Sequence, residues 1–462
     1  MIEGSRGPAI AFGGFREPAR AFTDPSLLTG EPSVTVTVMV SPSPSSSAAA
    51  RTTAPADSTD PSHRTAVALV AVLAALTAVA PLATDMYVPG FPAMGDTLGA
   101  SSSAVQLTMT AFLAGLVVGQ LLIGPLSDSL GRRGLLLYGT AAFTVFSVGC
   151  ALAPNIGVLT GARFLQGLAG AAGMVLARAV LTDRFQGAEL PRYFAVLSQI
   201  MGVAPVAAPV LGGAVLAVST WRAVFVVLTV MGGLLLLGVV RKVPETLPPE
   251  RRHPGGITNT FRAMGELLGR RTFMGYVLVL AFISAALFAY ISGSSFVFEN
   301  LHGVSATTYS LIFASNAVAM LIAGATFSQL AGRVRLNNLL VGAVCVAGVG
   351  ALAQVLLVLT VGETLAGTWI TLFVTAGGIG MVFPSTLSIG QALGRNAPGA
   401  ASALLGGLQF LFGALAAPLV GVFGEDSSLP MAVIMLIAVA AAGVALVALA
   451  RPWEGRGEPT ES

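Results

Sequence analysis

The sequence predicts an all-α polytopic membrane protein with twelve transmembrane helices. Of its 462 residues, 55% are hydrophobic and only 10% are charged, and the mean hydropathy is +0.83. In a soluble domain, about a quarter of the residues are usually charged. The apolar residues form long runs separated by short polar connections. A run of about 20 such residues crosses a hydrocarbon core of about 30 Å as a helix.

The apolar runs from Arg64 onward divide into twelve spans. Composition alone defines their ends, with a margin of about 2–4 residues. The predicted spans are 65–88, 104–126, 134–154, 157–180, 192–216, 222–240, 272–297, 305–330, 337–360, 365–392, 400–423 and 429–450.

The spans fall into two sets of six, joined by the longest hydrophilic connection. Residues 1–62 are rich in Pro, Ser, Ala and Thr and are expected to form a disordered cytoplasmic tail. We predict a first six-helix half over 63–240, a central cytoplasmic linker over 241–271, a second half over 272–450 and a C-terminal tail over 451–462. Such halves fit parallel repeats related by an axis along the membrane normal.

The charges of the connections predict the orientation in the membrane. Basic residues gather in alternate connections, and such residues mark the cytoplasmic side. They are Arg132, Arg133, Arg184, Arg192, Arg333, Arg335 and Arg395. The other connections carry Asp96, Glu299, Glu363, Glu425 and Asp426, with Arg222 as the one basic exception. The protein is therefore expected in the plasma or inner membrane of the cell. Both of its termini are expected on the cytoplasmic side.

The central linker contains a candidate surface helix. Phe261, Met264, Leu267 and Leu268 recur at helical spacing and could form one apolar face lying on the membrane.

The connection between the second and third spans has an unusual composition. Residues 124–134 read GPLSDSLGRRG, with Asp128 beside two adjacent arginines. We expect a tight hairpin in which Gly124, Gly131 and Gly134 permit the reversal of the chain. A generic basic turn is the alternative. The spacing G-x-L-x-D-x-x-G-R-R is more specific than basicity requires, and it resembles the signature between spans two and three of the major facilitator superfamily.

Three ionisable side chains fall inside predicted spans of the first half. A charge there costs about 2.5–3.5 kcal/mol, so each is a functional candidate. Asp85 and Arg163 lie at similar depth on different spans, where a buried acid facing an arginine could titrate. Arg178 lies fifteen residues beyond Arg163 and is a second buried charge. Interfacial capping by Asp85 and snorkelling by either arginine remain the alternatives.

The fifth span contains GVAPVAAPVLGG. Its prolines and glycines predict a bent helix that packs closely on its neighbours. A generic kinked span is the alternative. The residues that match the antiporter signature of this span are Gly202, Pro205, Pro209, Gly212 and Gly213.

Together these stretches resemble the Bcr/CflA drug-resistance branch of that superfamily. TDMYVPGFP in span one, RFLQGLAGAAG in span four, WRAVF and PETL carry the same likeness, which covers about Arg64 to Arg451. The resemblance implies the major-facilitator fold and drug/proton antiport by alternating access. By position it implies that Asp85 and Arg163 couple protons, and that Gly124, Asp128, Gly131, Arg132 and Arg133 latch the two halves.

The substrate is expected in a largely apolar central cavity. Some multidrug relatives carry a further acid in span one, where this chain has Thr77, so neutral or weakly polar compounds are easier to accommodate than cations. Helix position suggests Tyr87, Met109, Phe112, Tyr290, Asn316, Gln391 and Gln409 as contacts, although each could equally be packing.

The predicted function is proton-coupled efflux of small amphipathic drugs, with export of an endogenous metabolite as the alternative. The proton gradient supplies the energy, and no cofactor or metal is expected. Predicted partners are the drug, protons and lipid, without nucleic acid, and the protein is expected to be a monomer. Enzyme activity is not expected, because the two cysteines and three histidines form no catalytic or metal-binding pattern.

Overall fold

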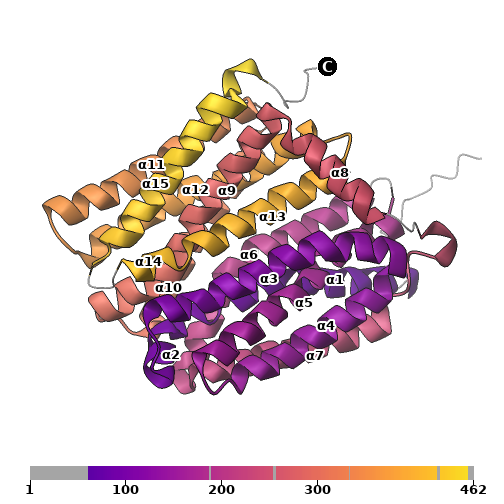
Figure 1. The fold of residues 1–462 in the computed structure, drawn as a ribbon, viewed down its shortest axis with the longest axis horizontal. Helices are drawn as coiled ribbons and strands as arrows, with labels where there is room; N and C mark the ends of the chain where they lie inside the picture. Colours follow the sequence, from indigo (N-terminus) through magenta and orange to yellow (C-terminus); the bar gives the residue numbers. More distant parts are fainter. Residues whose placement is uncertain (1–60, 187–188, 253–255, 332, 424–426, 456–462) are drawn as a thin grey trace, which may run out of the picture. The chain divides into compact units, whose positions relative to one another are not determined.

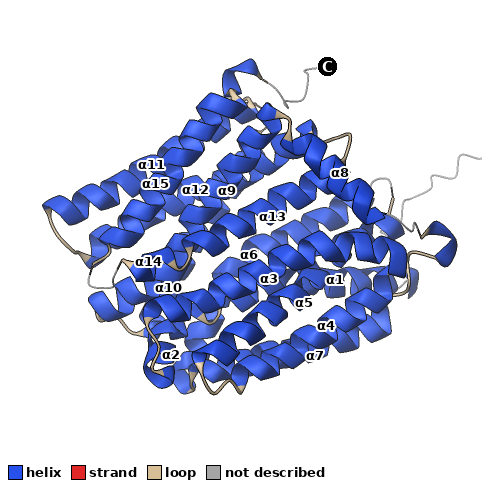
Figure 2. Ribbon diagram, in the orientation of Figure 1, coloured by secondary structure: helices blue, strands red, loops and turns tan. Residues whose placement is uncertain are grey.

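All regular structure among the described residues is helical, and no strand occurs there (Figure 2). The computed structural model describes residues 61–186, 189–252, 256–331, 333–423 and 427–455. The predicted disordered tail, apart from Pro61 and Ser62, lies outside the described residues, as do the topology markers Glu425 and Asp426.

Twelve helices within the described residues are long and apolar enough to cross a membrane. This confirms the predicted fold class. The first half contains α1 (Pro61–Asp85), η1 (Val88–Gly90), α2 (Phe91–Leu98), α3 (Ser102–Leu130), α4 (Arg132–Ala151), α5 (Ile156–Arg184), α6 (Glu189–Val218) and α7 (Trp221–Lys242). The linker contains η2 (Pro249–Arg251) and α8 (Gly256–Leu268). The second half contains α9 (Arg271–Ser295), η3 (Phe296–Leu301), α10 (Ala306–Leu330), α11 (Leu336–Thr360), α12 (Leu365–Leu393), α13 (Pro398–Ala416), α14 (Leu419–Val422), α15 (Leu429–Ala445) and η4 (Leu446–Ala450), and η5 (Pro452–Glu454) follows.

Equivalent helices of the two halves have the same neighbours. In the first half α5 packs on α3, α4 and α1, and α4 also packs on α7. In the second half α12 packs on α10, α11 and α9, and α11 also packs on α15. Each helix of the first set corresponds to the helix six spans later in the second set. The repeat that the sequence carries only weakly is therefore plain in the packing.

The halves meet along two equivalent helix pairs, α3 with α13 and α6 with α10 (Figure 1). We call this boundary the seam. Each pair joins the second span of one half to the fifth span of the other, as an axis along the helices would require. Described residues from both halves belong to one compact unit, Ser58–Ser462.

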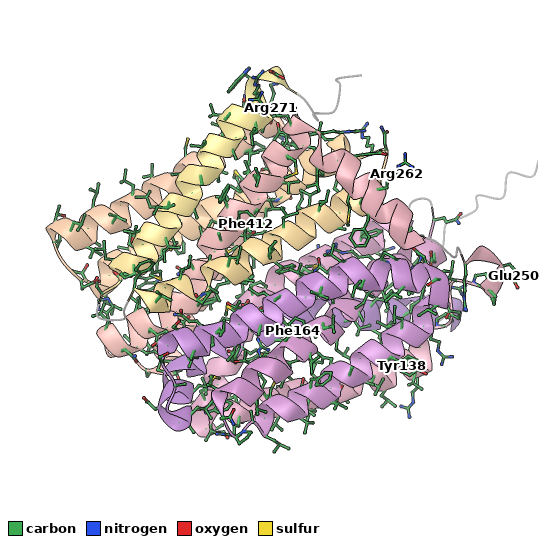
Figure 3. The ribbon with its side chains drawn as sticks, in the orientation of Figure 1. Tyr138, Phe164, Glu250, Arg262, Arg271 and Phe412 are labelled. Carbon is green, nitrogen blue, oxygen red and sulfur yellow. The ribbon has the colours of Figure 1, made fainter. Side chains whose placement is uncertain are left out.

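The helices end at two faces. We call the end that carries Gly131, α8 and Arg271 the linker face, and the end that carries α2, η3 and α14 the opposite face (Figure 1). Figure 3 labels Arg262 and Arg271 at the linker face.

The predicted surface helix of the linker exists as α8, but its apolar side chains divide between two sides. Met264 and Leu267 are buried against the start of α9 and α13, whereas Phe261 and Leu268 are each 46% exposed. α8 contacts α3 in the first half and α13 in the second. One side of the helix therefore packs on protein at the seam, and the other is free to contact lipid.

Candidate functional site

Arg163 is fully buried in α5, with none of its side chain exposed. Its Nη1 donates a hydrogen bond of 2.6 Å to Gln166 Oε1, and its Nη2 donates one of 3.1 Å to the carbonyl of Ala83. Within the described residues no carboxylate lies in ion-pair range of this guanidinium. Neutral acceptors thus hold a buried cation, which is costly unless its remaining faces are also stabilised.

Three aromatic rings supply that stabilisation. The guanidinium carbon lies 4.3 Å from the centre of the Tyr87 ring, 4.2 Å from that of Phe112 and 5.7 Å from that of Phe225. The negative face of each ring attracts the cation. Phe112 can approach because α3 and α5 touch closely, and a Cβ at Gly167 would collide with the Phe112 carbonyl.

The bond from Arg163 to Ala83 fixes the end of α1. The last four carbonyls of a helix have no partner within it, and α1 ends at Asp85. Arg163 satisfies the Ala83 carbonyl and places a cation at the negative end of the helix dipole. The guanidinium therefore holds the turn of backbone from which Asp85 projects.

Gln166 completes this cluster, and sequence reasoning missed it. Its Nε2 donates to Ser147 Oγ at 2.7 Å, and Ser147 in turn donates to the Phe143 carbonyl of α4 at 2.7 Å. The sequence signal that could have identified Gln166 is its position three residues after Arg163, because residues i and i+3 share a helix face. Gln166 thereby orients the arginine that fixes α1.

Asp85 is only 4% exposed, and its Oδ1 has no hydrogen-bond partner. The predicted pairing with Arg163 was wrong for this structure: the arginine is occupied by Ala83 and Gln166 and makes no ion pair with Asp85. The residues that follow Asp85, in η1, contact α9 and α10 of the second half. The acid therefore lies only two residues after the carbonyl that the arginine binds, at the end of α1 next to the second half.

The second half presents polar groups to this region. Asn316 Nδ2 donates to the Tyr290 hydroxyl at 3.0 Å, whereas Asn316 Oδ1 is buried without a partner. The Tyr290 ring stacks on Phe313 with centroids 5.2 Å apart. The Tyr309 hydroxyl lies 2.8 Å from Ser294 Oγ. Asp85 and the Asn316 carbonyl thus both retain unused hydrogen-bonding capacity.

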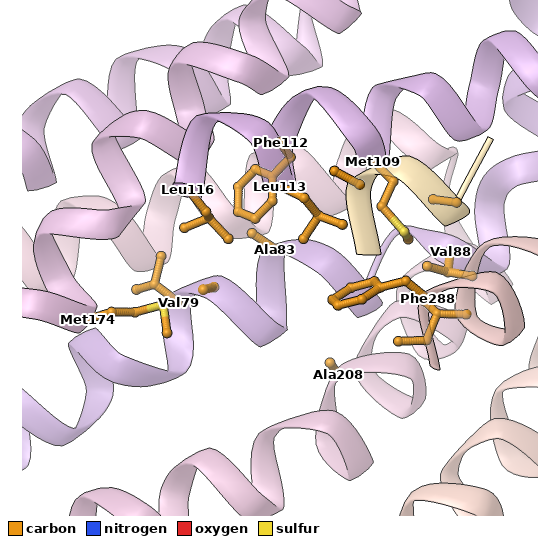
Figure 4. Close-up of a cluster of buried hydrophobic side chains, with 14 of the residues drawn as sticks. Val79, Ala83, Val88, Met109, Phe112, Leu113, Leu116, Met174, Ala208 and Phe288 are labelled. Carbon is orange, nitrogen blue, oxygen red and sulfur yellow. The ribbon is translucent and has the colours of Figure 1, made fainter. Parts of the chain in front are cut away.

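Most of the predicted substrate contacts are buried in this structure. Tyr87 and Phe112 surround Arg163, and Met109 belongs to the same apolar core, where Figure 4 shows it beside Phe112 on one helix. Gln391 and Gln409 are half-buried on α12 and α13. Their role in binding stays a prediction.

The turn between α3 and α4 is tighter than predicted. Helix α3 continues through Gly124 and Pro125 to Leu130, and α4 begins at Arg132. Gly131 alone reverses the chain, with φ of 98°. The prediction that Gly124 and Gly134 also serve the turn was wrong, because neither adopts positive φ.

The charges beside this turn contact the first half and the linker. Arg132 forms ion pairs with Asp128 at 2.6 Å and with Asp183 of α5 at 3.2 Å. Arg133 Nη2 donates to the Val240 carbonyl at 3.1 Å. None of these contacts crosses the seam, so the proposed latch between the halves stays a prediction.

Glu245 of the PETL stretch joins the same cluster. Its carboxylate accepts hydrogen bonds from the backbone N–H groups of Arg132 at 2.9 Å and Arg133 at 3.3 Å, at the start of α4. Burial opposes ionisation, but these donors, together with the N–H groups of Leu247 and Thr246, outweigh it and hold the pKa of Glu245 below its usual range. The linker is thus fastened to the turn.

Comparison with known proteins identifies the family. Residues 73–417 match the family model of the Major Facilitator Superfamily. The chain belongs to this superfamily.

Relatives support the predicted drug-resistance subfamily of the Major Facilitator Superfamily. The chain is 40% identical over 399 residues to an uncharacterized MFS-type transporter, YdgK, of Bacillus subtilis, covering 86% of this chain and 99% of the relative. It is 28% identical to a bicyclomycin resistance protein homolog of Haemophilus influenzae, over 78% and 91% of the two chains. A D-xylose–proton symporter structure is 15% identical and has a TM-score of 0.62, covering 81% of this chain and 96% of the symporter, which shows the shared fold.

The family makes the chain a multi-pass membrane transporter rather than an enzyme, as predicted. The predicted close packing of the fifth span can be located on α6. A Cβ at Gly212 would collide with the Met86 carbonyl, and one at Gly213 would lie 2.7 Å from Ser310 Cβ across the seam. Pro205 and Pro209 lie within α6, which continues through both.

Arg178 is the one predicted buried charge whose side chain is exposed. Its Nη2 contacts Met201 Sδ of α6 at 3.5 Å. Both its neighbours in the chain face inward or are half-buried. The structure therefore separates Arg178 from the enclosed cluster around Arg163.

Proposed function

We propose that this superfamily member exports small amphipathic drugs in exchange for protons. It does so by alternating access in the cell membrane, with the linker face and both termini in the cytoplasm. Relatives are named for resistance to bicyclomycin and chloramphenicol and for multidrug transport, and the basic connections favour this orientation. The protonatable group is Asp85.

The observation that carries the proposal is the position of Asp85. It is buried where the halves meet, with an oxygen that has no partner. An ionised carboxylate enclosed without a cation is costly. Closing the seam over Asp85 therefore favours the protonated carboxyl, and opening it to water permits ionisation. Proton binding can thus bias two arrangements of the halves.

The cycle follows from this bias. Asp85 takes a proton from the outside, the opposite face closes, and the proton is released to the cytoplasm while a drug binds. Arg163 keeps the end of α1 in place throughout, so that the acid moves with its helix. One charge moved through 100 mV supplies about 2.3 kcal/mol, which supports a drug gradient of roughly fortyfold.

Thr77 favours neutral substrates in this scheme. It is 1% exposed and donates to the Ala74 carbonyl at 2.7 Å. It therefore offers no charge to a cation at that depth of α1, and we infer neutral or weakly polar drugs as substrates.

Drug uptake into inside-out vesicles, with and without an uncoupler, tests the proposal. Neutral and cationic drugs are compared for the wild type and for Asp85→Asn, which we expect to lose uncoupler-sensitive uptake of neutral drugs entirely. Asp96→Asn is the control, because Asp96 is exposed on α2. Unchanged proton-driven uptake by Asp85→Asn would refute the assignment. Absence of drug uptake by the wild type would favour a metabolite exporter instead.

A further inference from the structure

Glu299 is an acidic side chain at the opposite face that, unlike the exposed Asp96, is partly enclosed, and the mechanism above does not use it. It lies in η3, a π-helical turn at the end of α9. Its side chain is half-buried, and Oε1 is buried without a hydrogen-bond partner. Single π-helical turns are rare and occur frequently at functional sites. Half-burial leaves the carboxyl within reach of protons from the opposite face.

The surroundings of Glu299 contain no cation that forms an ion pair with it among the described residues. α2, α9 and α10 pack on η3. Their titratable side chains are Asp96, which is exposed, Tyr276, Tyr290 and Tyr309, which are buried, and Arg271, which is exposed at the linker-face end of α9. In the next turn His302 Nε2 is also buried without a partner.

Glu299 and Asp85 come from different halves, at places where elements of the two halves meet. The π-helical turn η3, which carries Glu299, contacts α2 and α10, and η1, which follows Asp85, contacts α9 and α10. The halves are in contact here, since the rings of Phe91 and Phe296 lie 6.1 Å apart across the seam. Each carboxylate loses water when it is enclosed at this end of the seam, and burial disfavours the ionised form. Closure of the opposite face is therefore most favourable when both carboxyls carry protons.

We propose that Glu299 is a proton-binding site that gates the opposite face. It takes a proton from water on that side as the seam closes, and it returns the proton to the same side as the seam opens. Its proton therefore controls the conformational equilibrium without crossing the membrane. This inference rests on the proposed function only in assigning the transported proton to Asp85.

Distance measurements between spin labels test the inference directly. Cysteines replace Thr97 on α2 and Thr307 on α10, which are exposed on different halves at the opposite face. Cys345→Ala removes the exposed native thiol, and Cys150 is retained because it is buried. Purified protein in lipid nanodiscs is titrated with pH in the absence of drug.

We expect the label distance to lengthen as the pH rises. The dependence of the open population on pH should have the steepness expected for the release of about two protons per opening. Glu299→Gln should reduce this steepness to about one proton, as should Asp85→Asn, and the double variant should respond little to pH. Glu299→Asp keeps a titrating carboxyl and should retain the wild-type steepness. Asp96→Asn is the matched control and should behave as the wild type.

The outcomes separate this inference from the proposed function. An unchanged pH response in Glu299→Gln would overturn the gating role, and so would opening that follows sodium concentration at constant pH. In vesicles, Glu299→Gln should leave unchanged the charge that crosses the membrane for each drug molecule transported. A smaller charge per drug molecule would mean that the Glu299 proton crosses the membrane, which would contradict the gating role. Failure of wild-type drug uptake would refute drug export while leaving the pH-dependent distance intact.

Discussion

At the scale of single residues, a distant carboxylate completes the start of a helix. Gly131 precedes α4 and has no side chain that could cap it. The carboxylate of Glu245, 113 residues further along the chain, accepts the N–H of Arg132 instead. An anion at a helix N-terminus is stabilised by the unpaired N–H groups and by the helix dipole. A linker residue thereby acts as a cap for a transmembrane helix.

Glu245→Gln should reduce stability at neutral pH by about 1 kcal/mol, the usual cost of losing a helix cap. Because folding lowers the pKa of Glu245, its contribution is fully present above the ordinary glutamate value of about 4.3 and is lost as the pH falls through the lower folded value. Thermal unfolding in detergent should therefore show the wild-type and variant curves converging in acid. Glu266→Gln, at an exposed pair with Arg262, is the control, and a constant difference between wild type and Glu245→Gln across this range would contradict the account.

At the scale of helices, one amide joins α3 to two elements of the other half. Gln106 is 1% exposed. Its Nε2 donates to the Ser292 carbonyl of α9 at 3.2 Å, and its Oε1 accepts from Gly421 N–H of α14 at 2.9 Å. The break between α13 and α14 near Pro418 leaves the first N–H groups of α14 unpaired. Gln106 satisfies one of them and links the two halves at the opposite face.

Gln106→Leu should shift the protein toward an open opposite face. Each buried group left without a partner costs about 1–3 kcal/mol, so at fixed pH the open population should rise on the order of tenfold. The spin-label pair described above measures this change. Ser129→Ala is the control, because the hydrogen bond of Ser129 among the described residues lies within α3, to Leu126. A distance distribution identical to that of the wild type would exclude a clamping role.

At the scale of the whole transporter, glycines set how closely the halves approach. The second span of each half packs across the seam on the fifth span of the other half. At the opposite-face end of the α6–α10 pair, Gly213 lies against Ser310. Any larger residue there must displace one half from the other. The small residues of the fifth span thus permit close packing both within the first half and between the two halves.

Gly213→Ala should weaken closure of the opposite face by about 1–3 kcal/mol, the usual cost of overpacking. Drug efflux should fall with it, because the proposed cycle requires this closure. Ser310→Gly should restore efflux in the double variant, since removing one side chain accommodates the other. Gly233→Ala is the control, because a Cβ there meets nothing within 4 Å. Failure of the double variant to recover would contradict the packing explanation.

The sequence by itself determined the fold class, the twelve spans and the family. Each depends on local signals: apolar runs of membrane length, basic connections, and the motif at Asp128 to Arg133. The candidates Asp85 and Arg163 were also found locally, because charges inside apolar runs are rare.

Only the tertiary structure decided what these residues contact. Arg163 caps α1 through Ala83 rather than pairing with Asp85, and Glu245 and Gln106 make contacts that no local pattern showed. Their partners come from other helices or from the other half, at sequence separations of up to 315 residues. A hydrogen bond or an unpartnered oxygen depends on which helices pack together and at what register, and apolar composition leaves that register undetermined.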